Sequence, residues 1–164
     1  MQIPLVDEQD EIIGSKEHVE LDYAKDTFRT ASLWITSSNG DILLARRRIN
    51  KKVDPGKWAE AVGGTVEGDD SYENTIIREA EEELGLKDIE ISLGPKQFID
   101  SSAKYFVQWY IVTVDYPIDQ FVIQEEEVEQ IAWISKAQLR QELISNPSKY
   151  IPAMQDIVTL FGVG

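Results

Sequence analysis

The sequence predicts an α/β fold in which a mixed β-sheet is covered by helices on both faces, an α/β/α sandwich. Two observations support this prediction. Short apolar runs typical of strands alternate with turn-forming residues over most of the chain, and an amphipathic helix with clear start and stop signals is expected over residues 71–84. Two more helices are expected near the C-terminus, one capped by Ser135 and one over residues 152–161. Because helices and sheets each bury an apolar side against another element, these pieces should stack in layers.

Two β-hairpins are expected in the first third of the chain. The first turns through a run of acidic residues close to the N-terminus. The second turns at Asn39-Gly40, a dipeptide that strongly favours a tight hairpin turn. A further strand then leads into the glycine pair Gly63-Gly64. These strands are expected over residues 3–6, 11–13, 29–36, 41–45 and 58–62.

The second half of the chain should complete the sheet. Residues 105–114 are almost continuously apolar or aromatic, as expected of a strand covered on both faces. Since no linker or repeat is visible, the 164 residues are expected to form one domain. Its parts would be an N-terminal hairpin over about 1–28, a core over about 29–145 and a C-terminal helix over about 150–162. Other strands are expected over residues 89–93, 98–100 and 128–134.

Composition excludes several kinds of protein. The chain has no cysteine, which rules out disulfides, thiolate metal sites and cysteine nucleophiles. Thirty acidic against sixteen basic residues give a net charge of −14, which repels nucleic acid polymers and anionic membranes. No apolar run has the length of a membrane span, and the N-terminus lacks the layout of a signal peptide. A soluble, cytoplasmic protein is the expectation.

The helix expected over residues 71–84 carries a row of carboxylates. Asp70 or Ser71 can cap its N-terminus, and Gly85 supplies the usual stop. On a helical wheel Glu79, Glu82 and Glu83 lie within about 100° of one another. The apolar residues Ile76, Ile77, Ala80 and Leu84 occupy the adjoining arc and are expected to face the core.

Three carboxylates on one helical face repel one another and need a positive partner. Arg78 lies one turn before Glu82 and can orient it, but one arginine does not balance three carboxylates. A hard divalent cation does, because Mg²⁺ prefers oxygen ligands and is commonly held by carboxylates together with substrate phosphates. The other interpretation is a solvated acidic helix face.

The same stretch resembles the signature of the Nudix hydrolases, G-x5-E-x7-R-E-U-x-E-E-x-G-U, where U is aliphatic. Asp70 replaces the first glutamate and Ala80 takes a position that usually carries a larger aliphatic residue. Residues 6–14 also resemble the start of the branch related to isopentenyl diphosphate isomerase, and the resemblance extends over residues 1–140 or so. The residues in register with the signature are Gly64, Arg78, Glu79, Glu82, Glu83, Gly85 and Leu86.

The resemblance implies hydrolysis of a nucleoside diphosphate linked to another moiety, or of a similar organic pyrophosphate. It implies Mg²⁺, or alternatively Mn²⁺, held together with the main-chain carbonyl of Gly64. It leaves the general base open. The metal-binding carboxylates would be Glu79, Glu82 and Glu83; Arg78 would hold Glu82; and the candidate bases are Glu82, Glu126 and Glu127.

A basic cluster stands out in this acidic chain: five of the sixteen basic residues fall within residues 46–52. Arginine suits bidentate contact with phosphoryl oxygens. The family resemblance favours Arg46 or Arg47 as the residue that binds the far phosphoryl group of the substrate, while the alternative is a solubilising loop.

Two other functions compete with the hydrolase. One is a catalytically silent ligand-binding module, which the replacement at Asp70 favours. The other is an isopentenyl diphosphate isomerase, which is disfavoured because that chemistry relies on a cysteine in the resembling family. The identity of the small-molecule pyrophosphate and the oligomeric state stay open, and a homodimer is compatible with the sequence.

Overall fold

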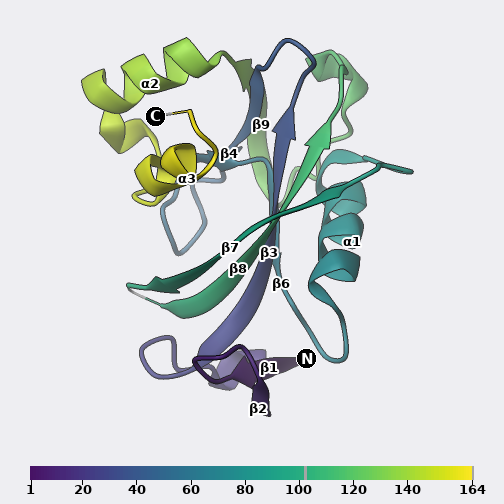
Figure 1. The fold of residues 1–164 in the computed structure, drawn as a ribbon, viewed down its shortest axis with the longest axis vertical. Coiled ribbons are helices and arrows are strands. Elements are labelled where there is room, and N and C mark those ends of the chain that lie inside the picture. Colours follow the sequence, from purple (N-terminus) through teal and green to yellow (C-terminus); the bar gives the residue numbers. More distant parts are fainter. Residues whose placement is uncertain (102, 164) are drawn as a thin grey trace.

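The computed structural model describes residues 1–101 and 103–163. A mixed seven-stranded sheet forms its centre, with helix α1 (Tyr72–Leu84) against one face and helices α2 (Lys136–Ser145) and α3 (Met154–Leu160) on the other side (Figure 1). Strands β1 and β2 form a separate two-stranded sheet at the end of the molecule where the chain begins. The predicted α/β sandwich with a mixed sheet is confirmed.

The strands follow the order β5-β4-β3-β8-β7, with β6 pairing β3 and β9 pairing β4. The pair β3–β8 is parallel, and the other pairs are antiparallel. The strands are β1 (Gln2–Val6), β2 (Ile12–Glu17), β3 (Thr27–Thr36), β4 (Ile42–Arg47), β5 (Trp58–Glu60), β6 (Val62–Thr65), β7 (Ser92–Asp100), β8 (Lys104–Thr113) and β9 (Val128–Ile134).

The sheet is split between β3 and β4. These strands pair only at Thr36 and Ile42, beside the Asn39-Gly40 turn, and then diverge. Residues 58–65 enter the gap, where β5 pairs with β4 and β6 pairs with β3. The prediction of one strand over residues 58–62 was therefore wrong, because a single straight strand cannot pair with two diverging neighbours. The chain breaks at Ala61 and forms two short strands instead.

Helix α1 begins and ends where local signals predict. The Ser71 hydroxyl accepts a hydrogen bond from the amide of Asn74 at 3.0 Å, and Gly85 ends the helix with φ of 68°. The apolar prediction was partly wrong: Ile77 is 41% exposed. The buried arc is centred nearer to Glu79 and Glu83 than expected, so both are half-buried.

Each face of the sheet has its own apolar core. On the face that α1 covers, the α1 face, residues such as Leu33, Ile35 and Tyr110 pack against the helix. On the opposite face, the C-terminal face, Trp34 and Trp109 pack against residues of α2 and α3. Among the residues that the structure describes, none of the helices combines the length and the apolar character needed to cross a membrane.

Two predicted boundaries differ from the structure. The strand expected over residues 89–93 begins only at Ser92 and continues to Asp100 as β7, with a shift in its pairing with β8 between Leu93 and Lys96. The last helix begins at Met154, after an irregular turn, instead of at residue 152. In both cases the apolar residues lie near the core. However, only part of the first segment pairs with a neighbouring strand, and only part of the second is helical.

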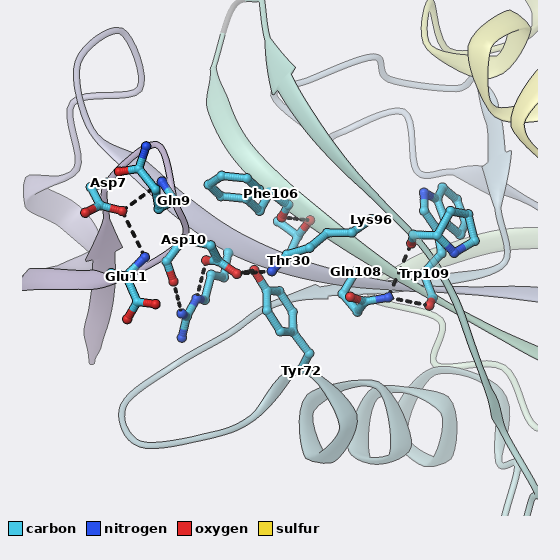
Figure 2. A network of polar contacts seen from close by, with 12 residues as sticks. Asp7, Gln9, Asp10, Glu11, Thr30, Tyr72, Lys96, Phe106, Gln108 and Trp109 are labelled. Atoms are coloured by element: carbon cyan, nitrogen blue, oxygen red, sulfur yellow. Dashed lines mark hydrogen bonds and ion pairs between the residues drawn. The ribbon is translucent and has the colours of Figure 1, made fainter.

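The N-terminal hairpin is tied to the main sheet through Asp10 (Figure 2). Its carboxylate accepts hydrogen bonds from Arg29 Nε at 2.7 Å, from the Tyr72 hydroxyl at 2.9 Å and from Lys96. Burial by itself raises the pKa of Asp10, but the hydrogen bonds from Lys96, Arg29 and Tyr72 together outweigh it and hold that pKa below its usual value. One side chain thus connects the hairpin to β3, α1 and β7.

Candidate active site

The glycine loop and the acidic helix meet at Gly64 and Glu79. Strand β6 pairs Gly64 with Ala31 of β3, which turns residue 64 toward α1. A Cβ on residue 64 would lie 2.6 Å from Cγ and 2.7 Å from Cδ of Glu79, which real side chains essentially never tolerate. A side chain at residue 64 would therefore displace the Glu79 side chain, and the main chain of Gly64 lies against the Glu79 carboxylate.

Glu79 and Glu83 form a pair of neighbouring carboxyl groups one helical turn apart. Each of the two carboxyl groups affects the pKa of the other. Burial, followed by the negative charges of Glu79 and Glu127, raises the pKa of Glu83 to about 9. Burial and the charge of Glu82 also raise the pKa of Glu79. The site thus holds more negative charge than its surroundings neutralise.

Arg78 contacts partners other than the expected one. Its guanidinium forms an ion pair with Asp70 and approaches Oε1 of Glu79 to 3.8 Å, whereas an ion pair with Glu82 is absent from the described residues. The hydrogen bond to Asp70 raises the pKa of Arg78. Asp70 therefore anchors Arg78 beside Glu79, while Ser71 serves as the helix cap and Glu82 is exposed.

The acidic loop at residues 121–127 lies on the last turn of α1. The amides of Val122 and Gln124 donate to the carbonyls of Leu84 and Glu83 at 3.0 and 2.9 Å. These two main-chain bonds fix the loop next to the acidic pair, which is why the charge of Glu127 reaches Glu83. Both Glu126 and Glu127 are exposed, and Glu127 forms an ion pair with Lys51.

The basic cluster closes its own loop. Arg46 Nε donates to the carbonyl of Gly56 and Arg47 Nε to that of Val53, each at 3.0 Å. A guanidinium has five N–H donors, and each of these contacts uses one. Lys51 then links the loop to Glu127, so the basic cluster and the acidic loop lie on the same side of the site.

Glu60 is a residue that the sequence analysis did not single out. Its Oε1 accepts a hydrogen bond from the Ser32 hydroxyl at 3.3 Å, and burial raises its pKa. Its other oxygen, Oε2, is buried and has no hydrogen-bond partner among the residues that the structure describes. The available signal was one carboxylate inside the otherwise apolar run from Trp58 to Val62.

Comparison with known proteins identifies the class of enzyme that this fold and acidic helix define. The sequence profile of the NUDIX domain matches residues 26–154, so the chain belongs to the Nudix family. It is a pyrophosphohydrolase of that family, acting on acid anhydrides in phosphorus-containing compounds.

Similar proteins match nearly the whole chain. An uncharacterized Nudix hydrolase of Pseudomonas aeruginosa is 30% identical over 155 residues, covering 94% of this chain and 87% of the relative. An isopentenyl-diphosphate Delta-isomerase of Corynebacterium glutamicum is 27% identical over 165 residues, covering 94% and 87%. A crystal structure of a protein from Deinococcus radiodurans superimposes with a TM-score of 0.83 at 20% identity, covering 97% of this chain and 98% of the other. The resemblance to the isomerase-related branch is confirmed.

Nudix enzymes generally use divalent metal ions, and the residues here fit one. In residues 1–101 and 103–163, no three His, Cys, Asp or Glu side chains are gathered closely enough to hold an ion without rearrangement. However, Glu79 and Glu83 lie one turn apart on α1, and the Gly64 main chain borders the Glu79 carboxylate. Oxygen donors of this kind suit a hard divalent cation.

Proposed function

We propose that this enzyme hydrolyses the pyrophosphate bond of a nucleoside diphosphate linked to another moiety, or of a similar organic pyrophosphate, with Mg²⁺ as its metal. The observation that carries the proposal is the Glu79 carboxylate held against Gly64, with Glu83 one helical turn away. Two adjacent buried carboxyl groups are costly unless a proton or a cation lies between them. A substrate with several negative charges needs that cation as well.

The metal-binding residues in this proposal are Glu79, Glu83 and the carbonyl of Gly64, joined by Glu82. A bound divalent cation would supply charge neutralisation of the phosphoryl oxygens and a more acidic water. Glu82 is exposed, so a rotation of its side chain would complete the set. Mn²⁺ is expected to substitute, since it accepts the same oxygen ligands.

Arg78 acts in this proposal as a positioning residue for Glu79. Its ion pair with Asp70 holds the guanidinium in place, and the 3.8 Å approach to Glu79 limits where that carboxylate can point. Arg46 and Arg47 would bind the far phosphoryl group with the guanidinium donors that their loop contacts leave over.

The proton of the attacking water would pass to a carboxylate near the acidic pair. Glu127 is our first choice, because its loop is hydrogen-bonded to the last turn of α1 and its charge acts on Glu83. Glu82 is the alternative on the helix itself, and Glu126 is the neighbouring candidate in the loop. The ion pair with Lys51 would hold the Glu127 carboxylate on the side of the basic cluster.

The proposal is tested by a screen of the purified protein against nucleoside diphosphate derivatives and other organic pyrophosphates. Reactions contain Mg²⁺, Mn²⁺ or EDTA, and a phosphatase added afterwards releases phosphate from monophosphate products for colorimetric detection. Metal-dependent release is expected with at least one compound. Binding without turnover across the panel would favour the silent module, and interconversion of isopentenyl diphosphate without phosphate release would favour the isomerase.

A further inference from the structure

Glu60 approaches the split between β3 and β4 from the side opposite to the acidic helix. Residues that face each other across an antiparallel pair point to the same side of the sheet. Glu60 faces Leu44 of β4, which belongs to the core of the C-terminal face. Gly64 points to the α1 face, where Glu79 lies. The two carboxylate groups therefore border the same split from its two faces.

The surroundings of Glu60 are polar and compact. Gly63 pairs with Ser32 and points to the same face. A Cβ on residue 63 would lie 3.2 Å from the Ser32 hydroxyl and 3.5 Å from Oε1 of Glu60. The main chain of Gly63, the hydroxyl of Ser32 and the carboxyl of Glu60 thus form one small patch. We call it the Glu60 patch (Ser32, Glu60 and Gly63).

The Glu60 patch contains an unused hydrogen-bonding atom. Ser32 is 4% exposed and occupies only Oε1, while Oε2 is buried without a partner in the described part of the chain. Buried polar atoms in folded proteins are nearly always hydrogen-bonded, and leaving one unpaired is costly. Such an atom beside a reaction site indicates a partner that arrives with the ligand.

The position of the patch indicates which part of the ligand arrives there. The patch lies close to the acidic pair, because Gly63 borders Oε1 of Glu60 and the next residue, Gly64, borders Glu79. Beside the acidic pair, helix α1 covers the α1 face of the sheet. A group attached to a diphosphate at Glu79 and Glu83 would therefore pass through the split toward Glu60.

We propose that Glu60 is a specificity-determining residue, whose Oε2 accepts a hydrogen bond from an N–H or O–H donor on the moiety attached to the diphosphate. The inference rests on the proposed function, because it takes the diphosphate to lie at the acidic pair. It predicts a substrate with a polar attached group, such as a sugar or a nucleobase, and it excludes a plain hydrocarbon diphosphate. A site built to hydrogen-bond a substrate donor strongly rejects analogues that lack one.

The experiment compares wild type, Glu60→Leu and Glu60→Gln by equilibrium binding in Ca²⁺, with ADP-ribose as a donor-bearing diphosphate and inorganic pyrophosphate as the bare diphosphate. Glu60→Leu should weaken ADP-ribose binding about tenfold or more, and pyrophosphate binding less than twofold. Glu60→Gln keeps a carbonyl acceptor and should lose less. Glu90→Leu, at an exposed position, is the matched control, and thermal unfolding checks that each variant is folded.

Binding of Mn²⁺, followed by electron paramagnetic resonance, should be the same in wild type and Glu60→Leu. The inference is wrong if ADP-ribose does not bind the wild type, if its affinity survives in Glu60→Leu, or if pyrophosphate or Mn²⁺ binding falls equally. Hydrolysis of ADP-ribose in Mg²⁺ separates the two proposals. If wild type and Glu60→Leu hydrolyse ADP-ribose at the same rate, only the role of Glu60 is wrong. If ADP-ribose binds in a Glu60-dependent way but is not hydrolysed, only the proposed hydrolase activity is wrong.

Discussion

Glu79 lies so close to Gly64 that no side chain fits between them. The distances of 2.6 and 2.7 Å from a virtual Cβ to Cγ and Cδ of Glu79 leave no room even for a methyl group. The contact joins β6 to α1 at the point where the main chain and a carboxylate border the same site. The conformation of Glu79 is therefore set by the strand as well as by its own helix.

Gly64→Ala should displace Glu79 and weaken metal binding. The methyl group must push the carboxylate aside, and overpacking of this kind costs about 1–3 kcal/mol in unfolding free energy. We expect Mn²⁺ affinity and hydrolytic rate to fall about tenfold or more, by titration calorimetry and initial rates. Gly14→Ala is the control, because a Cβ there meets nothing within 4 Å and should change neither.

Glu83→Gln should abolish metal-dependent hydrolysis and leave the fold intact. Amide oxygen binds cations more weakly than carboxylate, and we expect the rate to fall by about two orders of magnitude or more. The structural reason for an intact fold is that an amide removes repulsion from Glu79. Circular dichroism and initial rates measure the two effects. Glu81→Gln, on the exposed side of α1, should keep its activity. Wild-type turnover in Glu83→Gln would refute our metal assignment.

Without metal, the protein should lose stability as the pH rises from about 5 to 9. The pKa of Glu83 is raised to about 9 in the folded protein from an ordinary value of 4.5. A raised pKa means that the folded state binds a proton that the unfolded state has released, so stability falls through this window. A loss of about 1 kcal/mol would lower Tm by about 2–4 °C in EDTA. Mg²⁺ should reduce the loss by replacing the proton, and Glu83→Gln should remove most of it.

Asp10→Asn should loosen the N-terminal hairpin. It removes the charge that pairs with Arg29 and Lys96 but keeps a residue that tolerates the φ of 64° at this position. We expect a loss of about 2 kcal/mol at pH 7 by urea denaturation, and faster amide exchange in β1 and β2. Asp88→Asn is the matched control, since Asp88 also has a positive φ, of 53°, and is exposed.

The effect of Asp10→Asn should depend on pH in the opposite direction to that of Glu83. The pKa of Asp10 is lowered in the folded protein, so its contribution to stability is present above the usual value of 3.8 and is lost as the pH falls through the lowered pKa. The difference between wild type and variant should therefore shrink toward pH 2–3. A constant difference across the acid range would mean that the charge of Asp10 is not what holds the hairpin.

Local signals predicted much of the fold. Ser71 and Gly85 set the ends of α1, and Asn39-Gly40 set the β3–β4 turn, because each of these depends on a few neighbouring residues. The spacing of Glu79 and Glu83 placed both on one face of the helix for the same reason. These predictions needed no knowledge of which segments pack together.

Long-range pairing decided the rest. The break at Ala61 exists because β3 and β4 diverge, and nothing in residues 58–62 announces that divergence. Likewise Arg78 turns to Asp70, eight residues earlier, because the glycine loop brings that carboxylate back over the helix. Glu60 stood out only once Ser32, 28 residues away, was seen beside it.

The number of residues between the β4–β5 pairing and the β3–β6 pairing is fixed. Strand β5 is in register with β4 through Glu60, and β6 is in register with β3 through Gly64, with only three residues between. Removing or adding one residue there would turn every following side chain over to the other side of its strand. Either Glu60 would lose its contact with Ser32, or residue 64 would no longer point toward Glu79. Insertions and deletions should therefore not be tolerated between residues 60 and 64.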